Sequence, residues 1–157
     1  MDSNTWTLGP RHILVAVKEF AGEMRVHIRH HFNPDPVNTP QNLMPTKKGV
    51  ALMLSEWEDL KTYVSRVDQH IKNDSDNSWK LGERNIMVTV NKFSGERRVH
   101  IRQYFHPDSS NDLMPTKKGV ALNLAEWEML KQHVIAVDDA ITEMQQPVYY
   151  NPANCYY

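Results

Sequence analysis

Residues 6–35 read WTLGPRHILVAVKEFAGEMRVHIRHHFNPD, and residues 79–108 repeat them without a gap as WKLGERNIMVTVNKFSGERRVHIRQYFHPD. The match resumes at LMPTKKGVAL, residues 43–52 and 113–122, after a connection that is three residues longer in the first copy. It continues through SEWEDLKTYVSRVDQHI and AEWEMLKQHVIAVDDAI, residues 55–71 and 125–141. A similarity of this extent indicates a duplicated unit. The chain of 157 residues therefore divides into domains 6–72 and 79–144, a polar linker 73–78 and a tyrosine-rich tail 145–157.

Alternating side chains predict strands in each copy. Ile13, Val15 and Val17 alternate with side chains that face the other way, which is typical of a half-buried strand. The short glycine-containing turn that follows, FAGE or FSGE, predicts a hairpin. The same alternation places Phe20 and its counterpart Phe93 on the face away from the valines, where an exposed ring needs an explanation.

The returning strand predicts a basic ladder on that outer face. Side chains two apart on a strand lie about 6.6 Å from each other on one face. Val26 and Ile28 face the core, PTKKG follows a proline-marked loop, and a third apolar alternation begins at Val50 or Val120. The outward set is Arg25, His27, Arg29 and His31 in the first copy and Arg98, His100, Arg102 and Tyr104 in the second.

Each copy ends in a segment with helical periodicity. The apolar residues of the first are Trp57, Leu60, Val64, Val67 and Ile71, and those of the second are Trp127, Leu130, Val134, Val137 and Ile141. We expect both tryptophans in the core, because a stripe this regular must be covered. Capping boxes are expected where Ser55 precedes Glu58 and where Asn123 precedes Glu126. The plainest packing brings the helices and sheets of the copies together about a pseudo-twofold axis.

The net charge of −1 conceals a segregation of charge. The strand-like residues 6–54 and 79–124 carry +3 and +4, whereas the helix-like residues 55–72 and 125–144 carry −1 and −4. A basic face and an acidic back are therefore expected. No apolar run is long enough to span a bilayer, no export signal is visible, and Cys155 has no cysteine partner within the chain. These features favour a soluble protein of a reducing compartment.

A basic strand face with exposed rings is typical of proteins that bind single-stranded nucleic acid. Arginine and lysine contact phosphates, and splayed bases stack on rings. The acidic helices argue against a recognition helix, so we expect weak sequence selectivity and a strong dependence on salt. The candidate contact residues are Arg11, Lys18, Phe20, Arg25, Arg29, Phe32, Lys47 and Lys48 in the first copy and Arg84, Phe93, Arg98, Arg102, Tyr104, Phe105, Lys117 and Lys118 in the second.

Both copies resemble the C-terminal domain of the Positive Cofactor Four family of transcriptional coactivators. The resemblance rests on FAGE, IRHHF, TKKGVAL and EWEDL in the first copy and FSGE, IRQYF, TKKGVAL and EWEML in the second. It implies an α+β fold of two tandem repeats, each a four-stranded antiparallel sheet followed by a C-terminal helix, packed as an intramolecular pseudo-dimer whose sheets hold single-stranded DNA. It also implies contact roles for Phe20, Arg29, Phe32 and Lys48 and for Phe93, Arg102, Phe105 and Lys118.

The resemblance further implies a nuclear coactivator with partners in the transcription machinery. At the hairpin tip, however, Ala21 and Glu23, with Ser94 and Glu96 in the second copy, stand where the family carries lysines. This departure leaves open an interaction adaptor that keeps the fold with weakened DNA binding. A genome-maintenance factor, a viral replication protein, residence in a prokaryotic or virus-infected cytoplasm, binding to melted duplex or RNA, and further oligomerisation remain open as well.

Catalysis and metal binding find little support in the residues. No nucleophile–base pattern is visible, and nine of the nineteen carboxylates fall on the helix-like segments, so neither an enzyme nor a cofactor is expected. His27 and His31 would lie about 13 Å apart on a strand, which disfavours a metal site. Strand parity places Phe32 and Phe105 with the buried Val26, so core packing is as good an interpretation of these two rings as base stacking.

Overall fold

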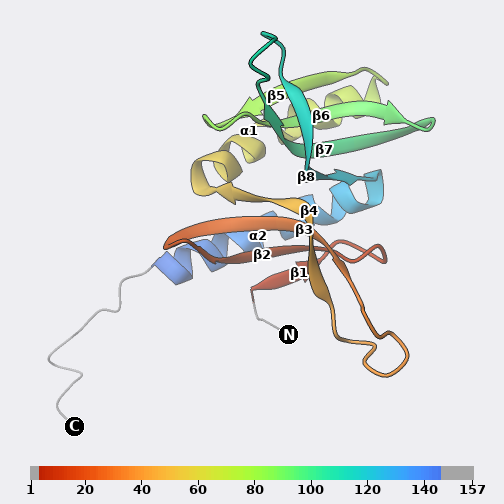
Figure 1. Cartoon of the computed structure of the whole chain (residues 1–157), viewed down its shortest axis with the longest axis vertical. Coiled ribbons are helices and arrows are strands. Elements are labelled where there is room, and N and C mark those ends of the chain that lie inside the picture. Colours follow the sequence, from red (N-terminus) through yellow and green to blue (C-terminus); the bar gives the residue numbers. More distant parts are fainter. Residues whose placement is uncertain (1–3, 146–157) are drawn as a thin grey trace, which may run out of the picture.

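The computed structural model describes residues 4–145, which form two four-stranded antiparallel sheets, each followed by a helix (Figure 1). This is the predicted α+β architecture of tandem repeats. Neither helix is long and apolar enough to cross a membrane. The first repeat contains β1 (Thr5–Thr7), β2 (Ile13–Phe20), β3 (Glu23–Phe32), β4 (Met44–Met53) and α1 (Leu54–Lys72). The second contains β5 (Asn77–Leu81), β6 (Ile86–Phe93), β7 (Glu96–Phe105), β8 (Met114–Leu122) and α2 (Leu124–Gln145).

The domain boundaries differ slightly from the expected ones. Strand β5 begins at Asn77, and the connection after α1 is therefore residues 73–76 rather than 73–78. This connection is tied to the second sheet, because Arg97 pairs with Asp74 at 2.8 Å and also with Asp76. Helix α2 extends to Gln145, which was assigned to the tail. The rest of the tyrosine-rich tail and Cys155 lie outside the described residues.

The two predicted hairpins form around two-residue turns. Ala21 and Gly22 have φ angles of 54° and 80°, and Ser94 and Gly95 have 54° and 82°. Two successive positive φ angles match the right-handed twist of the flanking strands. The turns pair Phe20 with Glu23, and the matching residues of the second hairpin in the same way, so each ring lies at a hairpin tip.

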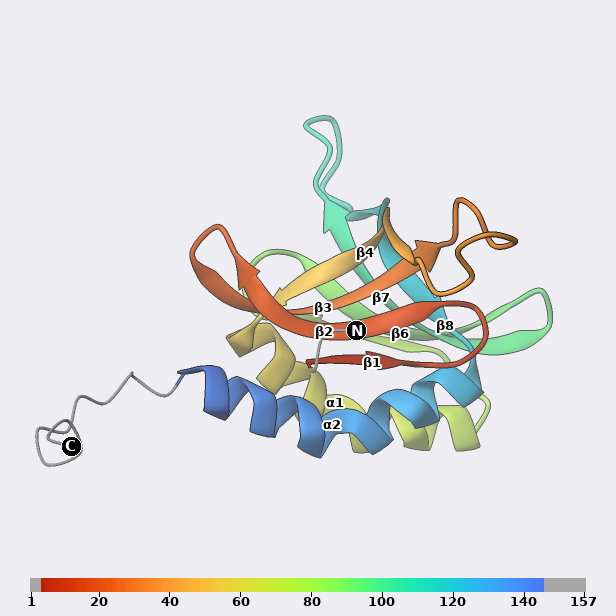
Figure 2. The ribbon, with the colours of Figure 1, turned by 90° about the horizontal axis from the view of Figure 1, so that it is seen from below.

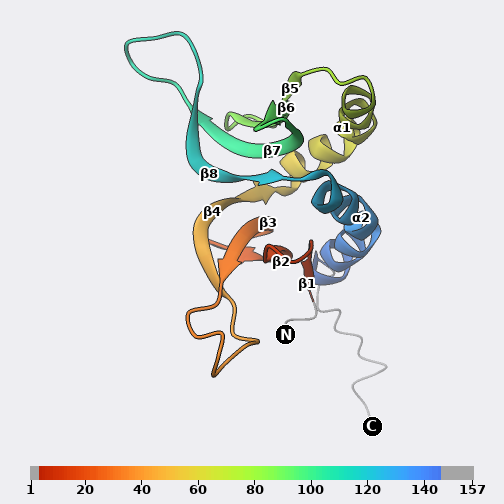
Figure 3. The ribbon, with the colours of Figure 1, turned by 90° about the vertical axis from the view of Figure 1, so that its right-hand side faces the viewer.

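Both helices lie on the same side of the two sheets (Figures 2 and 3). The alternating valines and isoleucines of the strands face them and form the core, in which Trp57 and Trp127 are almost fully buried, as predicted. Each helix also contacts the other repeat's sheet: the ring of Tyr63 on α1 stacks on Trp79 of β5 at 5.8 Å. The opposite face of both sheets carries no helix (Figure 3).

Equivalent polar contacts join the helices of the two repeats. Trp57 Nε1 of α1 donates to Asp138 of α2 at 2.8 Å, and Trp127 Nε1 of α2 donates to Asp68 of α1 at 2.7 Å. Each of these aspartates also accepts a lysine of the opposite helix at 2.9 Å. The repeats thus pack about a pseudo-twofold arrangement, as the sequence suggested.

A glutamate caps the start of each helix. Asn123 and Glu126 form the predicted box, with both backbone N–H groups bonded to the partner side chain at 2.8 Å. The box expected at Ser55 is wrong, because the N-cap of α1 is Met53, two residues earlier, and the N–H of Met53 donates to Glu56 at 2.7 Å. Glu56 and Glu126 occupy equivalent positions, and both are buried.

The same two glutamates bind an arginine of the other repeat. Arg11 donates Nε and Nη2 to Glu126 at 2.8 and 2.5 Å, and Arg84 donates the same atoms to Glu56 at 2.8 and 2.7 Å. A two-pronged arginine–carboxylate pair fixes orientation as well as distance. Each carboxylate therefore couples a helix start to the other repeat.

We expect Glu126→Gln to destabilise the chain by about 1–3 kcal/mol, because the amide keeps an acceptor for the cap but loses the charged pair with the partly exposed Arg11. Urea unfolding followed by tryptophan fluorescence measures the change. Glu128→Gln, which alters an exposed neighbour paired with Lys131, should change stability by less than about 0.5 kcal/mol. Equal effects of the two substitutions would contradict the assigned role of Glu126.

Candidate nucleic-acid interface

The open face of the first sheet is organised around β3. Its central strand places Arg29 between Leu14 of β2 and Gly49 of β4, and places His27 between Ala16 and Ala51. Small or apolar residues of the neighbouring strands therefore flank each polar side chain. The equivalent central residues of the second sheet are Arg102 and His100.

Glycine in the KKG segment lets the central arginine lie flat across the sheet. A Cβ built on Gly49 would meet Cβ and Cγ of Arg29 at 2.7 Å, and one on Gly119 would meet Arg102 at the same distance. The guanidinium of Arg29 then donates to the carbonyl of Thr46 at 2.9 Å. KKG lies inside β4 and β8 and not in a turn before the strand. Its glycine therefore allows the side chain of the central arginine to lie close to the backbone of the neighbouring strand.

The histidines of the ladder contribute no charge at neutral pH. Burial, reinforced by the nearby Lys18, Arg29 and Arg25, lowers the pKa of His27 to about 4. Burial and the neighbouring arginines lower the pKa of His100 as well. The positive charge of the face therefore comes from arginine and lysine alone. Within residues 4–145 no three histidines, cysteines or carboxylates cluster as metal ligands would.

Buried polar atoms without a protein partner gather on this face. They share a position on the outward side of β3, β6 or β7, and a buried polar atom left unpaired costs about 1–3 kcal/mol. In the described part of the chain they are Arg25 Nε, His27 Nε2, Asn91 Oδ1, Arg98 Nε and His100 Nε2. All five atoms lie beneath the open face and are closed to solvent.

The hairpin rings are exposed beside this polar face. Phe20 is 55% exposed and Phe93 is 60% exposed. The ring of Phe20 stands edge-on to His27 at 6.2 Å, and the guanidinium of Arg25 lies 5.7 Å from its centroid. A ring held in place by a cation and an imidazole presents a ready surface for stacking.

Phe32 and Phe105 are exposed too, each at 49%, so the core alternative for these rings is wrong. The extra residues at the register shift lie in β4 and β8, so the alternation along β3 and β7 is unbroken. Each ring is exposed because it is the last residue of its strand, beside an exposed methionine. Both rings end up at the strand ends, paired with Met44 and Met114.

A cationic groove of about 490 Å³ runs across the junction of the repeats. It brings together several predicted residues of both copies, and none of its lining residues is acidic. The cations that line it are Arg25, Arg29 and Lys47 of the first repeat and Arg84, Lys117 and Lys118 of the second, with Phe20 at its side. A groove lined in this way is complementary to a chain of phosphates.

Four of the arginines predicted to contact nucleic acid already form ion pairs within the protein. The guanidinium groups of Arg11 and Arg84 are held by buried glutamates, and they also donate to carbonyls of β8 and β4. Arg25 pairs with Glu23 at 3.0 Å, and Arg98 pairs with Glu96 at 3.4 Å. The hairpin carboxylates therefore offset part of the charge at each tip.

The remaining predicted residues lie around these features. Lys18 lines a second pocket, which lies on the first sheet. Tyr104 pairs with Pro115 beyond the register shift. The sequence missed the cap formed by Glu56 and the ion pairs that Glu56 and Glu126 make with an arginine of the other repeat, although a glutamate recurs before each helix tryptophan. It also missed Leu14 and the loop residues Gln41–Leu43, whose signal was the longer connection of the first copy.

Acidification should destabilise the protein through His27 and His100, whose pKa values are lowered by burial. The folded-state pKa of His27 lies below the ordinary value of about 6.5, so between pH 6.5 and 4 the unfolded chain binds a proton that the folded chain does not. Urea midpoints should fall over this range and fall less in the His27→Gln plus His100→Gln variant. The exposed His106→Gln variant should keep the wild-type slope, and an unchanged slope in the double variant would contradict this explanation.

Comparison with known proteins agrees with this picture. The family model described as Transcriptional Coactivator p15 (PC4) matches residues 10–63 and again 79–133. A putative RNA polymerase II transcriptional coactivator of Caenorhabditis elegans is 39% identical over 51 residues, which cover 32% of this chain and 41% of the relative. An RNA polymerase II transcriptional coactivator of Drosophila melanogaster is 36% identical over 64 residues, covering 41% and 56%. The matches thus span about half or less of these relatives' length.

The KELP coactivator of Arabidopsis thaliana is 33% identical over 61 residues, which cover 39% of this chain and 36% of the relative. The crystal structure of a MoSub1 complex with single-stranded DNA aligns at a TM-score of 0.41 and 16% identity, covering 48% of this chain and 88% of that one. Since the family model matches both repeats over more than half of the chain, this protein belongs to the Transcriptional Coactivator p15 (PC4) family and carries its domain twice.

Proposed function

We propose that the chain is a non-enzymatic protein that binds single-stranded DNA with weak sequence selectivity and acts as a transcriptional coactivator. The observation that carries this proposal is the open face of the paired sheets. It combines central arginines with exposed phenylalanines. Phosphates and bases each have a matching group on this face.

The placement of charge favours unpaired strands over duplex. The helices carry a net negative charge and lie behind the sheets (Figure 3), so neither is suited to enter a major groove. Rings that protrude from hairpin tips and strand ends can stack only on bases that are free of a partner strand. Because both repeats belong to one chain, the two sheets are joined at any protein concentration.

The coactivator role and its setting follow from the family. The relatives are named RNA polymerase II transcriptional coactivators, and we extend that role to this chain together with a nuclear location and partners in the transcription machinery. The chain matches only part of each relative, so the role rests on the domain that the repeats share with them.

A second candidate is the interaction adaptor, and the hairpin tips favour it. Glu23 and Glu96 pair with Arg25 and Arg98, and this pairing lowers the positive charge where the fold would meet DNA. An adaptor would leave a fluorescent oligothymidine unbound at low salt. The same titration therefore separates the two candidates.

Replacing both central arginines should weaken binding without unfolding the chain. In fluorescence anisotropy with labelled oligothymidine, Arg29→Ala plus Arg102→Ala should raise Kd about tenfold or more. The salt slope should become shallower by about 1.4, because each lost phosphate contact removes about 0.7. Arg66→Ala, an exposed arginine of α1, is the matched control and should leave both values unchanged. A wild-type slope near zero, or an unaffected double variant, would overturn the proposal.

Removing the hairpin rings should weaken binding in a different way. Phe20→Ala plus Phe93→Ala should cost about 1–3 kcal/mol for each base that stacks, while the salt slope stays at the wild-type value because no phosphate contact is lost. Ile135→Ala, an exposed apolar residue of α2, serves as the control. If the double variant binds like the wild type, the rings play no part in recognition.

A further inference from the structure

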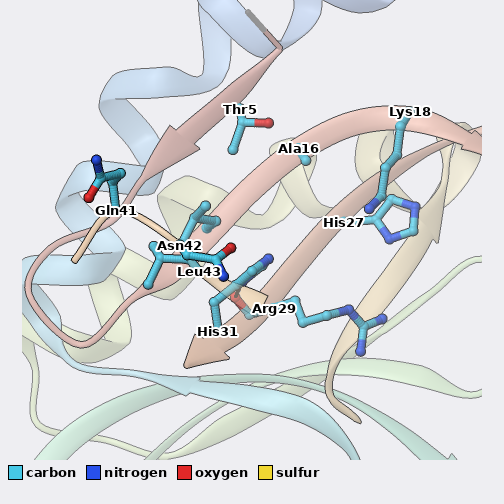
Figure 4. A pocket seen from close by; sticks show the side chains of 10 residues that line it. Thr5, Ala16, Lys18, His27, Arg29, His31, Gln41, Asn42 and Leu43 are labelled. Atoms are coloured by element: carbon cyan, nitrogen blue, oxygen red, sulfur yellow. Dashed lines mark hydrogen bonds between the residues drawn. The ribbon is translucent and has the colours of Figure 1, made fainter. Parts of the chain in front are cut away.

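The first repeat carries a pocket of about 440 Å³ on its open face (Figure 4). Figure 4 shows Ala16, Lys18 and His27 on the strands at one side and Asn42 and Leu43 of the β3–β4 loop at the other. The volume falls within the range of about 300–1,000 Å³ that is common for small-ligand sites. The pocket is therefore large enough for one nucleotide, and it adjoins the proposed DNA surface through Arg29.

The loop that forms this pocket distinguishes the two repeats. It comprises residues 33–43, whereas its counterpart in the second repeat comprises residues 106–113. The longer loop is braced by its own hydrogen bonds: Asn33 Nδ2 donates to the carbonyl of Thr39 at 2.8 Å, and the N–H of Thr39 donates to the carbonyl of Asp35 at 2.9 Å. The N–H of Asn42 donates to the same Thr39 carbonyl at 3.1 Å. The loop residues that line the pocket are thus held in place before any ligand arrives.

The pocket contains a buried polar atom that lacks a protein partner. His27 is only 7% exposed, and its Nε2 bonds to no other group of the chain. The imidazole is uncharged at neutral pH, because its pKa is about 4. Its Nε2 is closed to solvent, so the imidazole forms part of an uncharged wall of the pocket. The amides of Gln41 and Asn42 and the apolar side chain of Leu14 complete a mixed polar and apolar lining.

We propose that this pocket holds one splayed nucleobase of a bound single strand, so that the first repeat reads base identity at a single position. Amide side chains pair with base edges through two hydrogen bonds, and apolar groups contact the base faces. Arg29 and Lys18 lie at the pocket and are placed to hold the phosphates that flank the base. The inference rests on the proposed binding of single-stranded DNA and adds one selective position to an otherwise tolerant surface.

The second repeat lacks the chemistry of this pocket. The residues that match Gln41 and Asn42 are Asn111 and Asp112, so a carboxylate replaces an amide in the shorter loop. On the sheet, Asn91 replaces Lys18. A carboxylate near the phosphate path repels the strand. The two repeats are therefore expected to contribute unequally to base selectivity.

A loop exchange tests the proposal. Residues 33–42 are replaced by the sequence of residues 106–112, and anisotropy titrations compare labelled oligothymidine, oligodeoxycytidine and oligodeoxyadenosine of equal length. We expect the ratio between the strongest and the weakest of the three Kd values to change by at least about fivefold from the wild type to the exchanged chain. One base contact through two hydrogen bonds accounts for at least that discrimination. An unchanged ratio would overturn the inference.

Point variants keep the test decisive if the exchanged chain does not fold. Asn42→Ala should reduce the same discrimination, whereas Asp112→Ala, the matched change in the second repeat, should leave it intact. Equal effects of the two variants would also overturn the inference. Failure of the wild type to bind any of the three oligonucleotides would instead refute the proposed function, so the two failures are distinguishable.

Discussion

The arrangement of this protein depends on two buried carboxylates. Glu56 and Glu126 each accept the N–H that caps their own helix and the guanidinium of an arginine in the other repeat. A buried charge of this kind is tolerated only when its oxygens are fully paired, so a shift of either repeat would leave it exposed to a large desolvation cost. The interaction therefore holds three features in one geometry: the helix starts, the edge strands β4 and β8 that meet at the junction of the repeats, and the groove between the sheets.

From that geometry follows the separation of the molecule into a back and a face. The helices cover one side of both sheets with their aspartates and glutamates, and these bond to tryptophans and lysines of the opposite helix. On the other side, the central arginine Arg29 lies between small or apolar residues of the neighbouring strands. Burial of the histidines among these cations removes their charge. The face is thus cationic through its arginines and lysines.

Duplication within one chain has allowed the two copies to diverge. The contacts that join the repeats are nearly the same in both directions, because each is needed to satisfy an equivalent buried group. The loops after β3 and β7 have no such constraint, and they differ in length, internal bonding and charge. A pair of identical chains would carry the same loop twice. The tandem chain can keep one loop as a pocket wall and the other as a simple connection.

Much of the fold could be predicted from the sequence because it depends on local periodicity. The repeat, the hairpins, the buried tryptophans and the outward position of Phe20 all follow from alternation along one segment. The tertiary structure decided what depends on contacts between segments. Arg11 and Arg84 were expected at the DNA surface. Their partners are instead Glu126 and Glu56, which lie 115 and 28 residues away in the sequence. The exposure of Phe32 depends on its place at the end of β3, beside the exposed Met44, which parity counting does not detect. The pocket required a loop to fold back over the sheet, because a sequence shows how long a loop is but not where its side chains come to rest.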